Sequence, residues 1–229
     1  MAERSLPRLV IFDLDGTLVD TVPDIAVALN AALVDLAFPE VSATETRRWV
    51  GDGARVLCGR AIARGDHEMA DPLQADALLE RFLARYAERV CEASRVYDGV
   101  EEVLRWLRTQ GCRLACVTNK PAEHTEILLQ SLKLRASFDL VFGGDSLPAR
   151  KPDPLPLLEC LRHFGVAAHE ALMIGDSDND VTAARAAGIE CACVTYGYSQ
   201  GHDVHTLGAA LVIVSLRELS RYFKTANAT

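Results

Sequence analysis

The stretch of sequence that decides the fold is LVIFDLDGTL, residues 9–18. Its apolar residues 9–12 are typical of a strand that is buried on both faces of a sheet. Two carboxylates, Asp13 and Asp15, follow where this strand is expected to end, and Gly16 lets the backbone turn there. Because open α/β sheets bind ligands at the carboxyl ends of their strands, the stretch predicts a site as well as a strand.

Length, composition and charge limit the class of protein. The chain has 229 residues, 49% of them hydrophobic, which is enough for one large domain or for one domain with an insertion. The formal net charge of −8 argues against broad binding to nucleic acid or to an anionic membrane, so a small molecule is the expected partner. No apolar run is long enough to span a membrane, and residues 1–8 lack the apolar core of a secretion signal. We therefore expect a cytoplasmic protein, with its seven cysteines as small buried hydrophobes in a reducing compartment.

Beyond residue 98 the chain alternates between strand and helix patterns. Strands are expected at 114–118, 140–142, 171–175, 191–195 and 211–214, and helices near 100–110, 122–133, 154–164 and 179–187. This alternation predicts right-handed crossovers and a doubly wound parallel sheet that is covered on both faces, a Rossmann-like α/β fold.

Residues 21–95 show helical periodicity and almost no strand signal. Thr21 is expected to cap the first helix, with Asp24 as the acid at its third position. The sequence thus predicts an α/β core domain of residues 1–20 and 96–229, with a small all-helical domain of residues 21–95 inserted after the first strand. Its expected hinges are residues 19–21 and 94–99.

Three further polar clusters follow predicted strands: Thr118-Asn119-Lys120, Lys151-Pro152 and the GDSDND stretch at 175–180. In a parallel sheet they gather with Asp13 and Asp15 at one edge. Carboxylates this crowded repel one another, and a hard divalent cation relieves the repulsion. Asp13, Asp176 and the Asp15 carbonyl form a set of the kind that Mg²⁺ prefers. Lys151 and Thr118 would then face a phosphoryl group, whose oxygens need positive charge and donors.

These motifs, read in order along the chain, resemble those of haloacid dehalogenase superfamily phosphatases. The matching segments are DLDGTLVD at 13–20, Thr118-Asn119, Lys151-Pro152 and GDSDND at 175–180, and the resemblance covers essentially the whole chain. It implies that the inserted helical domain is a cap that closes over the active site and supplies specificity.

The resemblance also implies a role for each matching residue. Asp13 would be the nucleophile that forms an aspartyl-phosphate, and Asp15 would protonate the leaving alcohol and then activate water. Thr118 and Asn119 would hold the phosphoryl oxygens. Lys151 would stabilise charge on Asp13 and on the transferred group. Asp176 would ligate Mg²⁺, and Asp180 would orient the lysine or the waters of the metal.

Within this superfamily the chain most resembles the bacterial phosphoglycolate phosphatases, on residues 13–25, the glycine turn at 51–55 and the Lys151-Pro152-x-Pro154 pattern. The implied reaction is hydrolysis of 2-phosphoglycolate to glycolate and phosphate. Arg55 follows the turn and is a candidate to pair with the substrate carboxylate, while an ordinary surface ion pair is the alternative for it.

Other reactions of the superfamily stay open to different degrees. A sugar phosphate such as N-acetylmuramic acid 6-phosphate is the main alternative substrate, and a mutase is not excluded by the sequence. The phosphonate-cleaving branch needs a cap lysine, and residues 21–95 contain none. Carbon–halogen hydrolysis has no alkoxide leaving group to protonate, and dehalogenase relatives lack an acid at the position of Asp15, so the presence of Asp15 favours phosphoryl transfer. A catalytically inactive binding protein of this fold is expected to have lost one of the charged residues, yet all are present.

Several polar residues near the motifs have simpler interpretations. Asp20 and Asp24 are expected to serve the hinge or the helix start rather than the chemistry. Asp178 and Asn179 are expected to begin a helix. His202 and His205 are expected in a solvated loop.

Overall fold

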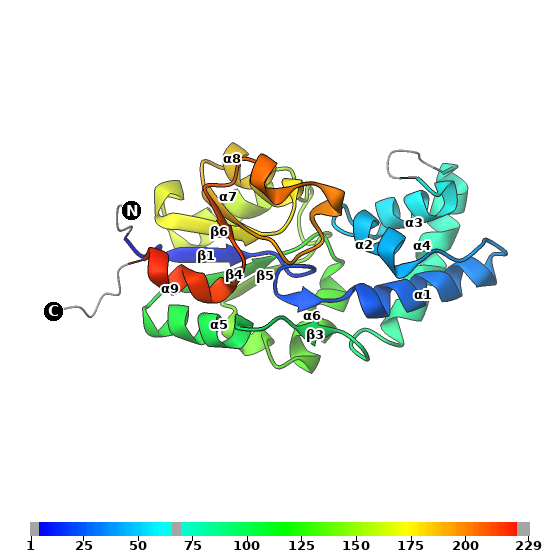
Figure 1. The fold of residues 1–229 in the computed structure, drawn as a ribbon, viewed down its shortest axis with the longest axis horizontal. Helices are drawn as coiled ribbons and strands as arrows, with labels where there is room; N and C mark the ends of the chain where they lie inside the picture. Colours follow the sequence, from blue (N-terminus) through cyan, green and yellow to red (C-terminus); the bar gives the residue numbers. More distant parts are fainter. Residues whose placement is uncertain (1–4, 66–69, 224–229) are drawn as a thin grey trace.

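The computed structural model describes residues 5–65 and 70–223 (Figure 1). Residues 1–4, part of the segment that is expected to lack a secretion signal, lie outside the described residues. Within the described part of the chain, no helix combines the length and the apolar character needed to cross a membrane.

Six parallel strands form the main sheet, in the order β5-β4-β1-β6-β7-β8. Their bounds are β1 Leu9–Phe12, β4 Arg113–Val117, β5 Leu140–Phe142, β6 Ala171–Gly175, β7 Glu190–Val194 and β8 Leu211–Ile213. The predicted Rossmann-like fold is confirmed, and each strand predicted after residue 98 is present within about one residue of its expected bounds.

The central strand β1 is buried on both faces because helices cover the sheet from both sides (Figure 1). Its side chains alternate: Leu9 and Ile11 pack with α7 and α8, whereas Val10 and Phe12 pack with α5, α6 and α9. These helices span α5 Val100–Thr109, α6 Ala122–Ser131, α7 Leu155–Phe164, α8 Asp178–Ala186 and α9 Leu219–Tyr222. The apolar run that opens the sequence therefore sits in the middle of two cores.

In the described residues of the insertion, 21–65 and 70–95, the chain forms four helices, which lie beyond the end of the sheet (Figure 1). They are α1 Val22–Asp35, α2 Ala43–Trp49, α3 Ala54–Ala63 and α4 Pro72–Ala87. α4 packs against both α1 and α3. Leu29 and Leu33 of α1 and Leu78 and Phe82 of α4 are among the residues buried between them.

The two connections to these helices run side by side as a small antiparallel ribbon. β2 (Val19–Asp20) pairs with β3 (Arg95–Val96), so the predicted hinge segments meet. On this arrangement we propose to divide the chain into a core, residues 1–20 and 96–229, and a cap, residues 21–95.

The start of α1 differs from the prediction. Thr21 precedes the helix, but its backbone is helical and its side chain makes no capping bond. Its hydroxyl instead donates to Asp15 Oδ1 at 2.7 Å. The Tyr198 hydroxyl serves the helix start, accepting from the backbone N–H groups of Thr21 at 2.6 Å and Val22 at 3.1 Å. Thr21 thus holds the predicted N-cap position and Asp24 the first turn, but the predicted capping bond of the threonine side chain is absent because a distant tyrosine hydroxyl accepts from the N–H groups there.

Asp24 joins the first cap helix to the chain that returns to the core. Its buried carboxylate, 2% exposed, accepts hydrogen bonds from the Ala93 N–H at 2.8 Å and from the Ser94 N–H and hydroxyl at 2.7 and 2.6 Å. These contacts serve structure, in keeping with the role expected for Asp24.

Replacing Asp24 tests this junction. In Asp24→Ala the buried donors of Ala93 and Ser94 lose their acceptor, so we expect the free energy of unfolding to fall by about 2–4 kcal/mol. Asp24→Asn keeps one acceptor oxygen and should lose less. Urea unfolding measures both variants. The exposed Asp76→Ala variant is the control, and an equal loss there would contradict the role of Asp24.

Candidate functional site

The predicted site residues other than Arg55 meet at one edge of the sheet, beyond the carboxyl ends of β1, β4, β5 and β6. Asp13 extends β1, since its N–H donates to the Ile174 carbonyl at 2.9 Å. Asp13 lies where β1 neighbours β6. The chain adds β4 and β5 on one side of β1 and β6, β7 and β8 on the other, and ligands in such folds usually bind at this switch in strand order. One pocket there is lined by residues that include Asp13, Asp15, Thr118, Asn119, Lys151 and Asp176.

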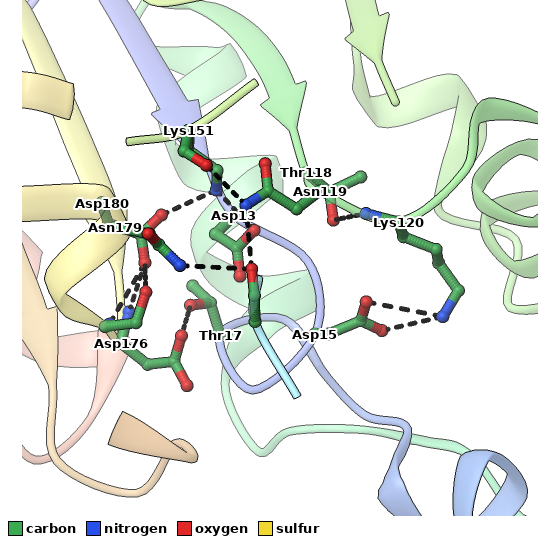
Figure 2. A network of polar contacts seen from close by, with 12 residues as sticks. Asp13, Asp15, Thr17, Thr118, Asn119, Lys120, Lys151, Asp176, Asn179 and Asp180 are labelled. Atoms are coloured by element: carbon green, nitrogen blue, oxygen red, sulfur yellow. Dashed lines mark hydrogen bonds and ion pairs between the residues drawn. The ribbon is translucent and has the colours of Figure 1, made fainter. Parts of the chain in front are cut away.

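Lys151 is held between two carboxylates. Its Nζ donates to Asp13 Oδ1 at 2.6 Å and to Asp180 Oδ1 at 2.7 Å (Figure 2). Asp180 is fixed in turn, because its Oδ2 accepts from the N–H groups of Asp176 and Ser177 and from the Ser177 hydroxyl, at 3.2, 3.1 and 2.8 Å. Asp180 therefore holds the lysine in place from the first turn of α8.

Three buried carboxylates crowd around this one lysine. Asp13, Asp176 and Asp180 each offer an oxygen within 4.8 Å of the others. Burial raises the pKa of Asp13 well above its ordinary value; Lys151 opposes this rise, while repulsion from Asp180 and Asp176 adds to it. Burial and the Asp180 charge raise the pKa of Asp176 to about 7. The cluster thus sets three carboxyl groups against one ammonium group, and further positive charge would favour their ionised forms.

This excess of charge is suited to a divalent cation. Lys151 and Ser177 occupy both oxygens of Asp180, whereas Lys151 bonds a single oxygen of Asp13. Asp176 is positioned by the Tyr198 N–H at 2.6 Å and by the Thr17 hydroxyl at 3.4 Å. Asp13 therefore keeps one oxygen that Lys151 does not bond and that could hold a cation. Both oxygens of Asp176 already accept hydrogen bonds, so its predicted place as a second ligand stays a prediction.

Gly16 is required by the close approach of Asp176 to the first loop. Its φ is +90°, and a Cβ atom on it would lie 2.2 Å from Asp176 Oδ2. The turn was expected from the sequence, and its tight contact with an acid from β6 comes from the fold.

The Asp15 carboxylate points away from the three-acid cluster. It accepts from Lys120 Nζ at 3.2 Å and from the Thr21 hydroxyl at 2.7 Å (Figure 2). Burial works against the charge of Lys120, yet Asp15 outweighs it and holds the pKa of Lys120 above its ordinary value. The carboxylate of Asp15 is thus engaged by Lys120 and Thr21 on the cap side, so the predicted metal ligand from this residue would be its carbonyl.

Thr118 and Asn119 have different surroundings. The Thr118 hydroxyl accepts from the Lys120 N–H at 3.2 Å and can still donate into the pocket. The Asn119 amide donates at 2.8 Å both to the Gly51 carbonyl of the cap and to the Lys151 carbonyl of the core. Its donors are thus occupied in joining cap and core.

Arg55 is not brought to the site. It lies on α3, exposed, where Nε and Nη2 contact the two carboxylate oxygens of Asp76 on α4 at 2.6 and 3.2 Å. It is not among the residues that line the pocket. Arg55 thus makes the surface ion pair that was the alternative for it, because a partner on the neighbouring helix is within reach, and its pairing with a substrate carboxylate stays a prediction.

The polar residues that were expected to have structural roles make the following contacts. Asp20 accepts from Arg47 and from the Tyr198 hydroxyl beside the ribbon. Asp178 begins α8 as expected. Asn179 does more than begin a helix, since its amide donates to Asp52 Oδ1 at 2.6 Å and so contacts the cap turn. His202 and His205 are exposed.

The cap closes the pocket with an apolar wall. Its residues are Ile25, Val50, Ala54, Leu57, Phe82, Leu83 and Tyr86. The Phe82 and Tyr86 rings stack at 5.6 Å, and Lys120 Nζ lies 4.5 Å from the centre of the Tyr86 ring. The cavity has a volume of about 50 Å³. The pocket has a charged end at Asp13 and a small apolar end under the cap.

Tyr86 and Tyr198 are pocket residues that the sequence reading missed, and Lys120 was expected at this edge of the sheet without a role of its own. Tyr198 follows β7, another strand end at the same edge of the sheet. Tyr86 is part of an ordinary helical apolar stripe, and nothing in the sequence separates it from core residues.

Comparison with known proteins places the chain in a family. Residues 10–194 match the haloacid dehalogenase-like hydrolases. The phosphoglycolate phosphatase of Pseudomonas putida is 46% identical over 94% of this chain and 79% of its own length. That of Nitrosococcus oceani is 42% identical over 96% and 98% of the two chains. The crystal structure of a predicted phosphoglycolate phosphatase from Haemophilus somnus is 34% identical, with a TM-score of 0.87 over 93% of this chain and 96% of that chain. The chain belongs to the haloacid dehalogenase-like hydrolase family.

Proposed function

We propose that this chain is a Mg²⁺-dependent phosphomonoester hydrolase whose substrate is 2-phosphoglycolate. The observation that carries the proposal is that the two acids of the first loop, Asp13 and Asp15, have different partners. Asp13 faces Lys151 and the buried acids, while Asp15 faces the cap end of the pocket. One acid is thus placed for attack at phosphorus and the other for proton transfer at the leaving group.

In the first half-reaction Asp13 attacks phosphorus, and the bond from phosphorus to the ester oxygen breaks. Lys151 holds the Asp13 carboxylate in position and offers positive charge to the transferred group. The Thr118 hydroxyl is placed to donate to a phosphoryl oxygen. Asp15, in its protonated form, gives its proton to the departing glycolate oxygen.

In the second half-reaction water attacks the phosphorus of the aspartyl-phosphate. Asp15, now a carboxylate, takes a proton from that water, and the bond between phosphorus and Asp13 breaks to release phosphate. Mg²⁺, held by Asp13, Asp176 and the Asp15 carbonyl, would neutralise charge on the phosphoryl oxygens. Asp180 keeps the Lys151 ammonium group in position during both half-reactions.

Two observations favour a small substrate. The relatives described above carry the name phosphoglycolate phosphatase. The cap wall of the pocket is apolar and leaves little space, so the hydroxyls of a sugar would lose hydrogen bonds on entering it. A two-carbon leaving group avoids this loss.

A substrate comparison tests the proposed activity. We expect kcat/KM for 2-phosphoglycolate to exceed that for glucose 6-phosphate and for N-acetylmuramic acid 6-phosphate, because the sugar hydroxyls find few partners under the cap. Phosphate release is measured with Mg²⁺ and again after chelation, which should abolish turnover. A preference for either sugar phosphate would overturn the proposed substrate.

Asp13→Asn tests the nucleophile. The amide cannot form an aspartyl-phosphate, so we expect kcat to fall by at least about a thousandfold. The fold should persist, because burial already disfavours the charged form of Asp13. Asp178→Asn removes an exposed acid at the start of α8 as a control and should keep wild-type activity. Near-normal turnover by a folded Asp13→Asn protein would contradict the assignment.

Asp15→Asn tests proton transfer with two leaving groups. Glycolate leaves poorly without a proton, so its ester should be hydrolysed about 10²- to 10⁴-fold more slowly. Nitrophenolate needs no proton, so the variant should release one equivalent of it from p-nitrophenyl phosphate in a burst, followed by slow turnover. Stopped-flow absorbance detects the burst. Equal slowing of both esters without a burst would remove the acid and base role.

A further inference from the structure

Lys120 is a buried cation that the two half-reactions leave without a task. Its side chain is 4% exposed, and its Nζ lies 3.2 Å from Asp15 Oδ1 and 4.5 Å from the centre of the Tyr86 ring. It extends from the loop after β4 toward the cap end of the pocket, on the side opposite Lys151 (Figure 2).

A carboxylated substrate needs a positive charge at this end. An unpaired carboxylate would lose its hydration against the apolar cap wall, at a large cost in free energy. Among the described residues that line the pocket, the basic side chains are Lys120 and Lys151. Lys151 is held between Asp13 and Asp180 at the phosphoryl end, and Arg55 is paired outside the pocket. Lys120 remains for the carboxylate.

The position of Lys120 relative to Asp15 fits the length of the substrate. Asp15 must reach the ester oxygen, and in 2-phosphoglycolate one methylene separates that oxygen from the carboxyl carbon. A group that hydrogen-bonds Asp15 is thus next to the place where the carboxylate must lie. An ammonium group has three donors, so Lys120 can contact Asp15 and the substrate together.

Tyr86 supplies a second donor at the same place. Its ring lies against Lys120, and its buried hydroxyl has no hydrogen bond of ordinary length among the described residues, with the Lys120 ammonium group as its neighbour. A buried hydroxyl without such a bond is uncommon in folded proteins and calls for an explanation, which a bound ligand would supply. The hydroxyl and the ammonium group together form a pair of donors under the cap.

We propose that Lys120, assisted by the Tyr86 hydroxyl, binds the carboxylate of the substrate and sets the preference for carboxylated phosphate esters. This inference rests on the proposed function. It replaces Arg55 as the carboxylate partner with a residue of the core that lies directly beside the proton donor.

The test compares two esters that differ at the carboxylate. 2-Phosphoglycolate and 2-hydroxyethyl phosphate have the same length, and the second has a neutral alcohol in place of the carboxylate. We expect the ratio of their kcat/KM values to fall about 10- to 100-fold in Lys120→Gln, the range expected for losing a charged hydrogen bond. Any effect of Lys120 on Asp15 alone slows both esters and cancels in the ratio.

Three further variants sharpen this test. Lys120→Arg keeps the charge and should keep most of the preference. Tyr86→Phe removes only a hydroxyl that has no hydrogen bond of ordinary length among the described residues, so it should fold normally, and the ratio should fall about 3- to 10-fold. This variant also tests the inference if Lys120→Gln does not fold. Lys133→Gln removes an exposed lysine as the matched control and should leave the ratio unchanged.

The outcomes separate this inference from the proposed function. If the wild-type protein shows no preference for the carboxylated ester, the inference about Lys120 is wrong, whereas the proposed substrate is decided by the comparison with the sugar phosphates. If the wild-type preference persists in Lys120→Gln and in Tyr86→Phe, the proposed substrate stands and the assignment of Lys120 is wrong. If the preference is lost in Arg55→Ala instead, the cap arginine binds the carboxylate.

Discussion

The burial of three carboxylates around one lysine is the constraint on which the rest of the site depends. Asp13, Asp176 and Asp180 come from two strand ends and the first turn of a helix, and each is almost fully buried. Such a cluster persists only if its charges are compensated. Lys151 supplies part of the compensation, and backbone N–H groups at the start of α8 supply more. A divalent cation, or another positive charge at the reaction centre, would compensate the remaining negative charge of the carboxylates.

The two acids of the first loop show how one short segment serves two purposes. Asp13 still belongs to the β1 ladder, so its direction is set by the sheet. Asp15 lies beyond the ladder, and its carboxylate is directed by Lys120 and Thr21, which belong to the core and to the start of the cap. The strand β1 thus sets the direction of Asp13, whereas the direction of the Asp15 carboxylate depends on its contacts with Lys120 and Thr21.

Much of this arrangement was predictable from the sequence, for a physical reason. Parallel strands end at a common edge, so apolar runs followed by Asp13, Thr118 and Asp176 bring these residues together whatever the loops do. Partner choices were less predictable, because they depend on segments far apart in the chain. The Thr21 side chain was expected to cap α1, but the hydroxyl of Tyr198, from the loop after β7, accepts from the N–H groups there. Arg55 was expected at the substrate, but Asp76 on the neighbouring helix is within its reach.

Tyr198 has a consequence for how the cap and the acids communicate. Its backbone N–H fixes Asp176, and its hydroxyl accepts from the first N–H groups of α1 and donates to Asp20. One residue therefore ties a candidate cation ligand, through its backbone, to the start of the first cap helix, through its side chain. Thermodynamic reciprocity then applies: if a cation bound at Asp176 alters the orientation of α1, the orientation of α1 must alter the affinity for the cation by the same factor.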